Sequence, residues 1–427
     1  MAFNLLGFYK NYKSSPFARN ALTLTIGTTI AQFLPLLIYP ILARIYSPEQ
    51  FGILASLTSV ISILTVISTG KYEFAILVAK DDKDAANITC LSLVISLLFL
   101  LIILLPLYFF RNEVGRLCGN NLEYWILICP FAAFFINIFN CYNEWCVRKK
   151  YYFNLSLNKI TNSVSVTIGK LVFGFTKFQN SGLIIGDIIG RFITALCCVF
   201  RVINKDWVTF KKVSCKGMKN MAIKFIEFPK FTMPAQLLNT VGGAVPVLIL
   251  GAYYNNTDVG YFSMAITILS VPISVISISI RDTFRQKANE IYLEQGNFRR
   301  LFVKLFKILL VLTLVASLAV IYFLPDLFAF VLGKTWSVAG KYAQILLPMI
   351  AIDFIAISLS GVLIITNKLK QNLIWQLYYT FASIAPLIIA YLWDFNIYWA
   401  LILFSTFRAS AYIYLLFLSF YYSKGEK

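Results

Sequence analysis

The feature that most constrains this sequence is a series of long apolar stretches bounded by charged and turn residues. Each is about 18 residues or longer, and a helix that spans a bilayer needs about 20 mostly apolar residues. A transmembrane β-barrel is excluded because its strands would alternate apolar and polar residues, whereas stretches such as LSLVISLLFLLIILLPLYFF are continuously apolar. The sequence therefore predicts twelve membrane-spanning helices, at residues 21–42, 52–70, 85–110, 124–145, 155–176, 182–203, 231–254, 259–280, 301–324, 342–366, 372–393 and 396–422.

Composition supports a membrane protein and removes several classes of enzyme. Only 13% of the 427 residues are charged and 59% are hydrophobic, which is about half the charge density of an average soluble domain. Because the chain contains no His, catalytic triads that need imidazole and HExxH zinc sites are excluded. The sequence also has no GxxxxGKS or GxxxxGKT phosphate loop. We therefore expect no catalytic residues, no metal site and no cofactor.

The distribution of basic residues predicts the orientation. Of the 38 Lys and Arg residues, 29 fall in alternate loops on one side of the membrane, six on the other side and three within the stretches. Cytoplasmic loops carry the excess of Lys and Arg in membrane proteins, so we expect both termini in the cytoplasm. This bias accounts for most of the formal net charge of +19. The basic central segment at 204–230 is expected to contact anionic membrane lipids, not nucleic acid.

An internal repeat predicts two halves. Thr29-Ile-Ala-Gln32 in the first stretch is similar to Met233-Pro-Ala-Gln236 in the seventh, and hairpins at 46–52 and 255–260 follow at corresponding positions. Because each half holds an even number of stretches, the halves share one orientation, and a pseudo-twofold axis would lie along the membrane normal, as in transporters. We predict an all-α integral membrane protein with an N-terminal six-helix bundle at 1–205, a basic cytoplasmic linker at 206–229 and a C-terminal six-helix bundle at 230–427.

Charged residues inside the stretches are functional candidates because each costs about 2.5–3.5 kcal/mol at mid-bilayer. Asp187 and Arg191 lie one helical turn apart and pair on one helix face, in either a structural or a functional role. Lys170 belongs to a polar stripe of the fifth stretch, the least apolar of the twelve, and this stripe is expected to face protein or a watery cavity. Arg408 has no acid within four residues, and Asp353 on another helix is its nearest candidate partner, through a structural bridge or a functional site.

Further polar and basic residues complete the candidate site. Gln32 in the first stretch, and Gln236 and Asn239 in the seventh, either pack helices or line a central polar route. Basic residues at the ends of stretches either snorkel to the interface or add to the site. Arg285 is one such residue at a stretch end, and the basic candidates for the site are Arg44, Lys71, Lys170, Arg191, Arg281 and Arg408. They outnumber the buried acids, and such a balance suits an anionic headgroup, particularly a diphosphate, to which Arg and Lys donate charge-assisted hydrogen bonds.

One segment carries a family resemblance. The residues ARIYSPEQFG at 43–52 are preceded by Gln32 and Pro40 and followed by KYEFAI at 71–76. In these residues the sequence resembles bacterial polysaccharide-unit flippases of the O-antigen type, in the multidrug, oligosaccharidyl-lipid and polysaccharide exporter superfamily, which includes the MATE transporters. Beyond about residue 85, the span layout, the basic central loop and the region 281–296 agree. Many members have Arg where this chain has Lys71, a change that keeps the charge but loses the bidentate fork.

The resemblance implies a function. Members form two six-helix bundles around a central cavity and move an undecaprenyl-diphosphate-linked oligosaccharide, such as an O-antigen or capsule unit, from the cytoplasmic to the periplasmic or outer leaflet by alternating access. It also implies a place in the bacterial inner membrane, beside other polysaccharide-assembly membrane proteins. From their positions in the stretches, the polar and basic candidates named above would then contact the diphosphate and the sugars. Coupling to a proton or sodium gradient stays open, with the candidates Glu73, Glu144, Asp187 and Asp353.

Two other functions stay open. A cation-coupled exporter of drugs or small molecules in the same superfamily would favour more buried carboxylates than this chain has. A membrane-embedded glycan polymerase or transferase is disfavoured by the short outer loops and the absence of His. We therefore expect a flippase and not an enzyme.

Overall fold

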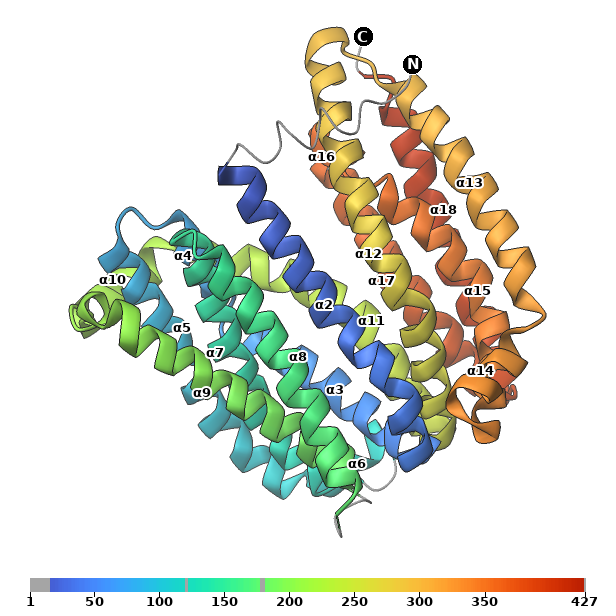
Figure 1. Cartoon of the computed structure of the whole chain (residues 1–427), viewed down its shortest axis with the longest axis horizontal. Helices are drawn as coiled ribbons and strands as arrows, with labels where there is room; N and C mark the ends of the chain where they lie inside the picture. The colour runs from blue at the N-terminus through green and yellow to red at the C-terminus, as the bar shows by residue number, and fades with distance from the viewer. Residues whose placement is uncertain (1–15, 120–121, 177–180, 426–427) are drawn as a thin grey trace. The chain divides into compact units, whose positions relative to one another are not determined.

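The chain is helical throughout its regular structure. The computed structural model describes residues 16–119, 122–176 and 181–425, and every regular element in them is a helix (Figure 1). The basic residues expected before residue 16, together with Lys177 and the last two residues, lie outside the described residues.

Each predicted stretch corresponds to one long helix. These helices are α2 (Pro16–Ile45), α3 (Pro48–Ser68), α5 (Asp82–Phe109), α7 (Cys129–Arg148), α8 (Tyr152–Gly174), α9 (Gly182–Phe210), α11 (Met233–Tyr253), α12 (Asn256–Gln295), α13 (Arg299–Ile321), α15 (Ser337–Ser358), α17 (Leu369–Leu392) and α18 (Ile397–Tyr422). Short helical segments lie between them: η1 (Tyr72–Phe74), α4 (Ala75–Val78), α6 (Arg111–Cys118), η2 (Trp125–Ile128), α10 (Cys215–Lys224), η4 (Phe228–Thr232), α14 (Leu324–Leu332), η5 (Lys334–Trp336) and α16 (Val362–Ile365). Within the described residues, eleven helices are long and apolar enough to cross a membrane, so the chain is a multi-pass membrane protein.

The long helix that misses this criterion is α8, the weakest of the predicted stretches. Its polar side chains pack against α2, which lies beside it (Figure 1). Ser156 Oγ donates to the carbonyl oxygen of Thr23 (3.0 Å), and Ser163 Oγ donates to that of Ala31 (2.7 Å). These two serines of α8 therefore face protein, and their packing against α2 places the less apolar α8 among the long helices.

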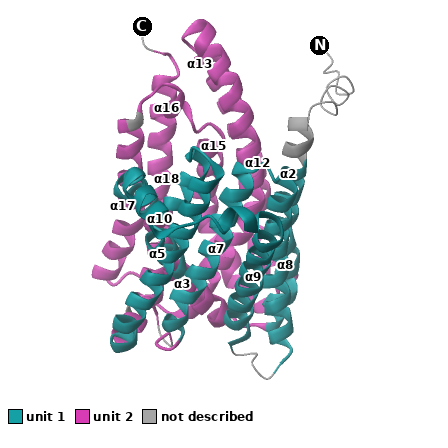
Figure 2. Cartoon of the chain, turned by 90° about the vertical axis from the view of Figure 1, so that its left-hand side faces the viewer, with its two compact units in different colours: residues 1–45, 61–111, 125–237 teal, residues 46–60, 112–124, 238–427 magenta. Residues whose placement is uncertain are grey.

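The described residues form two compact units (Figure 2). Unit 1 comprises residues 1–45, 61–111 and 125–237, and unit 2 comprises residues 46–60, 112–124 and 238–427. α3 thus begins in unit 2 and ends in unit 1. The all-α membrane fold with two helical units confirms the predicted fold class. The boundaries at 1–205, 206–229 and 230–427 and the pseudo-twofold axis stay predictions.

The basic central segment is folded onto unit 1. Ser214 caps α10 by accepting a hydrogen bond from the amide of Gly217 (3.1 Å). Met221 of α10 is buried in the core cluster that contains Trp145, and the Tyr72 hydroxyl donates to the carbonyl oxygen of Ala222 (3.0 Å). This segment is therefore an ordered part of the unit, not only a tether.

In unit 2, the two repeated hairpins pack against each other. Ser47 and Gln50 exchange hydrogen bonds in a capping box at the start of α3, while the Asn255 side chain caps α12. A side chain at Gly52 would overlap the backbone of Asn256, and one at Gly260 would overlap the backbone of Pro48. Only glycine permits this close, reciprocal approach of the two helix starts. The contact explains why the beginning of α3 belongs to unit 2.

α12 is longer than predicted. It continues for 40 residues, to a C-cap at Gly296, where the sequence suggested an end at residue 280. At 1.5 Å per residue it is about 60 Å long, twice the thickness of the hydrocarbon core. Arg281 and Arg285 therefore lie on a continuous helix, one turn apart, and not in a loop.

Replacing Gly260 with Val tests the helix crossing. We expect the variant to lose the close packing of α3 on α12, because overpacking of a helix contact costs about 1–3 kcal/mol or more. The measurement is the thermal unfolding midpoint of the purified protein, together with its yield in membranes.

The control is Gly243→Ala, since a side chain at Gly243 meets no atom within 4 Å. This variant should unfold at the wild-type midpoint or slightly above it. A Gly260→Val protein as stable as this control would contradict the proposed crossing.

Candidate functional site

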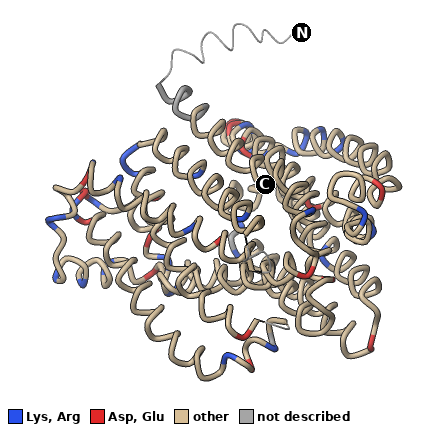
Figure 3. The backbone as a smooth tube through the Cα atoms, turned by 60° about the horizontal axis from the view of Figure 1, so that its bottom comes forward, with Lys and Arg blue, Asp and Glu red and all other residues tan. Residues whose placement is uncertain are grey.

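Unit 2 contains a cavity of about 560 Å³ that is lined by both polar and apolar residues. Its lining comes from α11, α12, α15, α17 and α18 and from the segment around α16. It includes two of the predicted site residues, Asn239 and Arg281. Charged residues are sparse along the long helices (Figure 3), so a cavity that gathers two arginines is distinctive.

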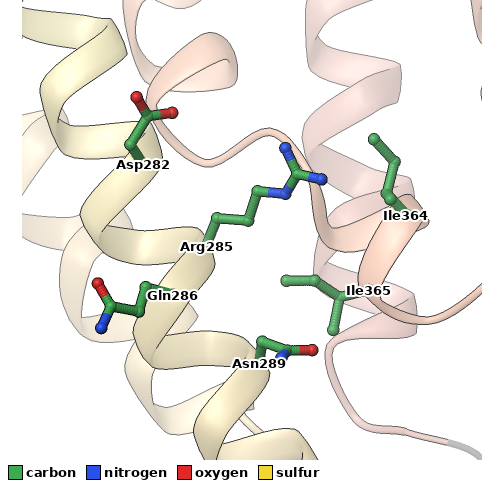
Figure 4. A pocket seen from close by; sticks show the side chains of 6 residues that line it. All are labelled: Asp282, Arg285, Gln286, Asn289, Ile364 and Ile365. Carbon is green, nitrogen blue, oxygen red and sulfur yellow. The ribbon is translucent and has the colours of Figure 1, made fainter. Parts of the chain in front are cut away.

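The α12 side of the cavity is cationic. Arg281 and Arg285 both line it, and Arg281 Nε lies 3.2 Å from Asp282 Oδ1, an acid that is 63% exposed. Within the described residues no hydrogen bond or ion pair engages Arg285, whose side chain packs over Gly361. A neighbouring pocket of about 490 Å³ shares Arg285, which extends from α12 toward α16 (Figure 4). The arginines therefore offer donors to an incoming anion.

The α17 side of the cavity is neutral and aromatic. Asn372, Trp375, Gln376 and Tyr379 line it at spacings of three, four and seven residues, which places them on one face of the helix. Asn239 of α11 also lines the cavity, and α11 lies beside α17 there, because Thr380 Oγ1 donates to a carbonyl oxygen of α11 (3.2 Å). The two sides of one cavity thus differ in charge and in chemistry.

Arg408 lies behind the aromatic side. Its guanidinium donates to the Tyr379 hydroxyl and lies over the rings of Tyr379 (4.8 Å to the centroid) and Phe404 (5.4 Å). The predicted ion pair with Asp353 is not formed among the described residues; instead, both groups interact with Tyr412. The two groups interact electrostatically, while Asp353 Oδ1 and Arg408 Nε are buried without a hydrogen-bond partner in the described chain.

A second charged group lies between α8 and α9 in unit 1. Asp187 pairs with Arg191 (2.5 Å), as predicted, and also with Lys170 (2.9 Å), and the Asp187 side chain is only 4% exposed. Lys170 reaches the carboxylate because Gly169 and Gly186 allow the two helix backbones to approach closely. This three-residue cluster keeps one net positive charge.

A third group follows α3. Lys71 Nζ lies 3.1 Å from Glu73 Oε1, and both side chains are buried, at 8% and 2% exposure. Glu144 of α7, which is half-buried, is within electrostatic range of both. The positive charge of Lys71 is therefore matched by carboxylates of its own unit.

Three predicted residues join none of these groups. Arg44 is exposed in the last turn of α2, and Gln236 is half-buried in α11. Gln32 is half-buried in α2, and its Oε1 atom has no hydrogen-bond partner within the described chain. Their assignment to a substrate site stays a prediction.

Sequence reasoning missed the aromatic half of the cavity. Trp375, Gln376, Tyr379 and Tyr412 line it but were not predicted, and Arg285 was noted only as a residue at a stretch end. The signal was available in the spacing of polar and aromatic residues along the eleventh stretch, NLIWQLYY. In a membrane helix this pattern is also typical of an interfacial belt, so it does not by itself indicate a site. Within the described residues, no group of three or more Cys, Asp or Glu side chains is placed to hold a metal ion.

One family model and several solved structures match the chain. A family model described as polysaccharide biosynthesis protein matches residues 41–341. No match was found among curated protein sequences.

Solved structures share the fold. A lipid II flippase, MurJ, in an inward closed conformation superposes with a TM-score of 0.75 at 14% identity, over 93% of this chain and 87% of that one. A multidrug resistance MATE family transporter in an inward-facing conformation gives a TM-score of 0.66 at 14% identity, over 93% and 97%. A transporter of the same superfamily from Pyrococcus furiosus, described as having a binding pocket of reverse polarity, gives 0.61 at 15% identity, over 94% of each chain.

Replacing Asp187 with Leu tests the cluster in unit 1. The change leaves Lys170 and Arg191 without their shared partner, and breaking a buried ion pair in this way costs about 3–5 kcal/mol. We expect a clear fall in the thermal unfolding midpoint of the purified protein.

The matched control removes all three charges together, as Lys170→Met, Asp187→Leu and Arg191→Met in one chain. Because no charge is left unpaired, this protein should recover most of the lost stability. A single Asp187→Leu variant that unfolds with the wild type would contradict the shared pairing.

Proposed function

Because this chain belongs to the polysaccharide biosynthesis protein family, we propose that it moves a lipid-linked oligosaccharide from one leaflet of a membrane to the other. The fold that it shares with a lipid II flippase and with multidrug transporters supports a protein that moves a molecule and does not remake it. The observation that carries the proposal is the cavity of unit 2, where Arg281 and Arg285 face a neutral, hydrogen-bonding wall.

The arginines suit the charged part of such a substrate. A diphosphate presents several oxygens in a geometry that the guanidinium fork binds with two parallel hydrogen bonds. Among the described residues Arg281 is paired only with the exposed Asp282, which water can solvate once a diphosphate replaces it. Arg285 brings a second guanidinium one helical turn away, so one diphosphate can contact both side chains.

The polarity of the cavity separates this function from export of cationic drugs. None of the residues that line the 560 Å³ cavity in the described chain is acidic. An organic cation would meet two arginines there, and the nearby carboxylate of Asp282 pairs with Arg281 and does not line this cavity, which opposes binding. Export of cationic compounds is therefore the second candidate, supported only by the fold of the multidrug transporters.

The full proposal is specific. The substrate is an undecaprenyl-diphosphate-linked repeat unit of O-antigen, capsule or a related glycan, and it moves from the cytoplasmic to the outer leaflet of a bacterial inner membrane by alternating access. Both termini lie in the cytoplasm, and anionic lipids contact the exposed lysines of α10. Other polysaccharide-assembly membrane proteins supply and consume the substrate. Glu73, Glu144, Asp187 and Asp353 are the carboxylates available for ion coupling.

Deleting the gene and complementing it tests the proposal. We expect deletion to remove surface polysaccharide and to leave lipid-linked repeat units on the cytoplasmic side, because the units can no longer cross. The wild-type gene should restore export, whereas Arg281→Ala should reduce it about 10- to 100-fold, the effect of losing a charge-assisted hydrogen bond. The measurements are surface glycan and the accessibility of lipid-linked units.

The control variant is Lys287→Ala. Lys287 is an exposed basic residue of the same helix that pairs with Glu290 (2.9 Å) and does not line the cavity. It should support wild-type export. Unchanged surface glycan in the deletion strain, or resistance to cationic dyes on overexpression of the chain, would count against flipping.

A further inference from the structure

We propose that the α17 side of the cavity is a carbohydrate subsite, in which Trp375 stacks on the sugar ring next to the diphosphate and Gln376 hydrogen-bonds to its hydroxyls. The inference rests on the proposed function and adds to it the part of the substrate that the cavity recognises beyond the diphosphate. A cavity of about 560 Å³ lies within the range that holds one compact ligand, ~300–1,000 Å³. It therefore takes the head of the substrate and not a long glycan with its lipid.

The first argument is the orientation of Trp375. Its indole Nε1 donates to the backbone carbonyl oxygen of Ala411 (2.9 Å), and this is the only hydrogen-bonding group of the side chain. With the donor occupied, the half-buried indole has only its ring face and edge to offer a ligand in the cavity that it lines. The C–H groups on the face of a sugar ring pack well against such a surface.

The second argument is that the neighbours of Trp375 are rigid. Its ring lies 5.7 Å from that of Tyr379 and 6.5 Å from that of Tyr412, at tilts of 38° and 43°. Tyr379 is 9% exposed, and its hydroxyl accepts a hydrogen bond from Arg408. The ring of Tyr379 also packs over Gly242 of α11. A wall held in this way binds without a large loss of side-chain entropy.

The third argument is the division of charge within one cavity. The arginines lie on α12, whereas the lining residues of α17 carry no charge and include the amides Asn372 and Gln376. A primary amide both donates and accepts, so it matches hydroxyl groups, which also do both. An anion-binding side beside a neutral, amide-rich and aromatic side is complementary to a sugar joined to a diphosphate.

Two probes distinguish binding of the sugar at the subsite from binding of the diphosphate by the arginines. They are a ten-carbon prenyl diphosphate that carries N-acetylglucosamine and the same prenyl diphosphate without the sugar, each titrated into the purified full-length chain by calorimetry. The wild type should bind the sugar-bearing probe more tightly. Trp375→Leu should weaken binding of that probe about 3- to 10-fold and leave binding of the sugar-free probe unchanged.

Three further variants keep the test decisive. Trp393→Leu, at an exposed tryptophan that follows α17 and does not line the cavity, should bind both probes as the wild type does. Trp375→Phe keeps an aromatic face and should retain part of the preference for the sugar. If Trp375→Leu does not fold, Gln376→Leu provides the same comparison, because it removes only the amide.

The outcomes distinguish the two claims. A loss confined to the sugar-bearing probe supports the subsite. An equal loss for both probes, or no loss for either, overturns the subsite and leaves the proposed function in place. A wild-type chain that binds neither probe overturns the subsite and the proposed function together.

Discussion

The structure depends on one constraint: a charge within the membrane must have a partner. An unpaired ionisable group at mid-bilayer costs about 2.5–3.5 kcal/mol on insertion scales, and several buried cations among the described residues have partners that offset this cost. Lys170 and Arg191 share Asp187, Lys71 pairs with Glu73, and Arg408 is held by aromatic rings and hydroxyls. Arg281 and Arg285, by contrast, have only an exposed acid beside them, which leaves them available to a substrate.

The long helices could be predicted from the sequence because span length and apolarity are local properties. The twelve stretches correspond to twelve helices, and even α8, whose polar face packs on α2, was placed correctly. The extension of α12 was missed because residues after 280 are too polar for a span, yet nothing in them ends a helix before Gly296.

The contacts between helices could be predicted only in part. The Asp187–Arg191 pair follows from helical spacing. Lys170 also pairs with Asp187 because Gly169 and Gly186 allow α8 and α9 to approach closely. The spacing of residues within one helix cannot reveal such a contact between two helices. Likewise, Trp375 becomes part of a cavity only because α17 faces α12 and α18 in the folded unit. The cavity brings two arginines of α12 together with amide and aromatic side chains of α17, a combination that exists only in the folded unit.

Transbilayer movement by the purified chain is the central claim, and a reconstituted assay measures it directly. A fluorescent short-chain prenyl diphosphate that carries a sugar is placed in both leaflets of liposomes containing the protein, with a proton or sodium gradient imposed in either direction, and an impermeant reductant is added outside. If the chain is a flippase, the inner-leaflet probe becomes accessible and the fluorescence falls to the level of detergent-opened liposomes. If only the outer-leaflet fraction is lost under every gradient, as in protein-free liposomes, the account is contradicted.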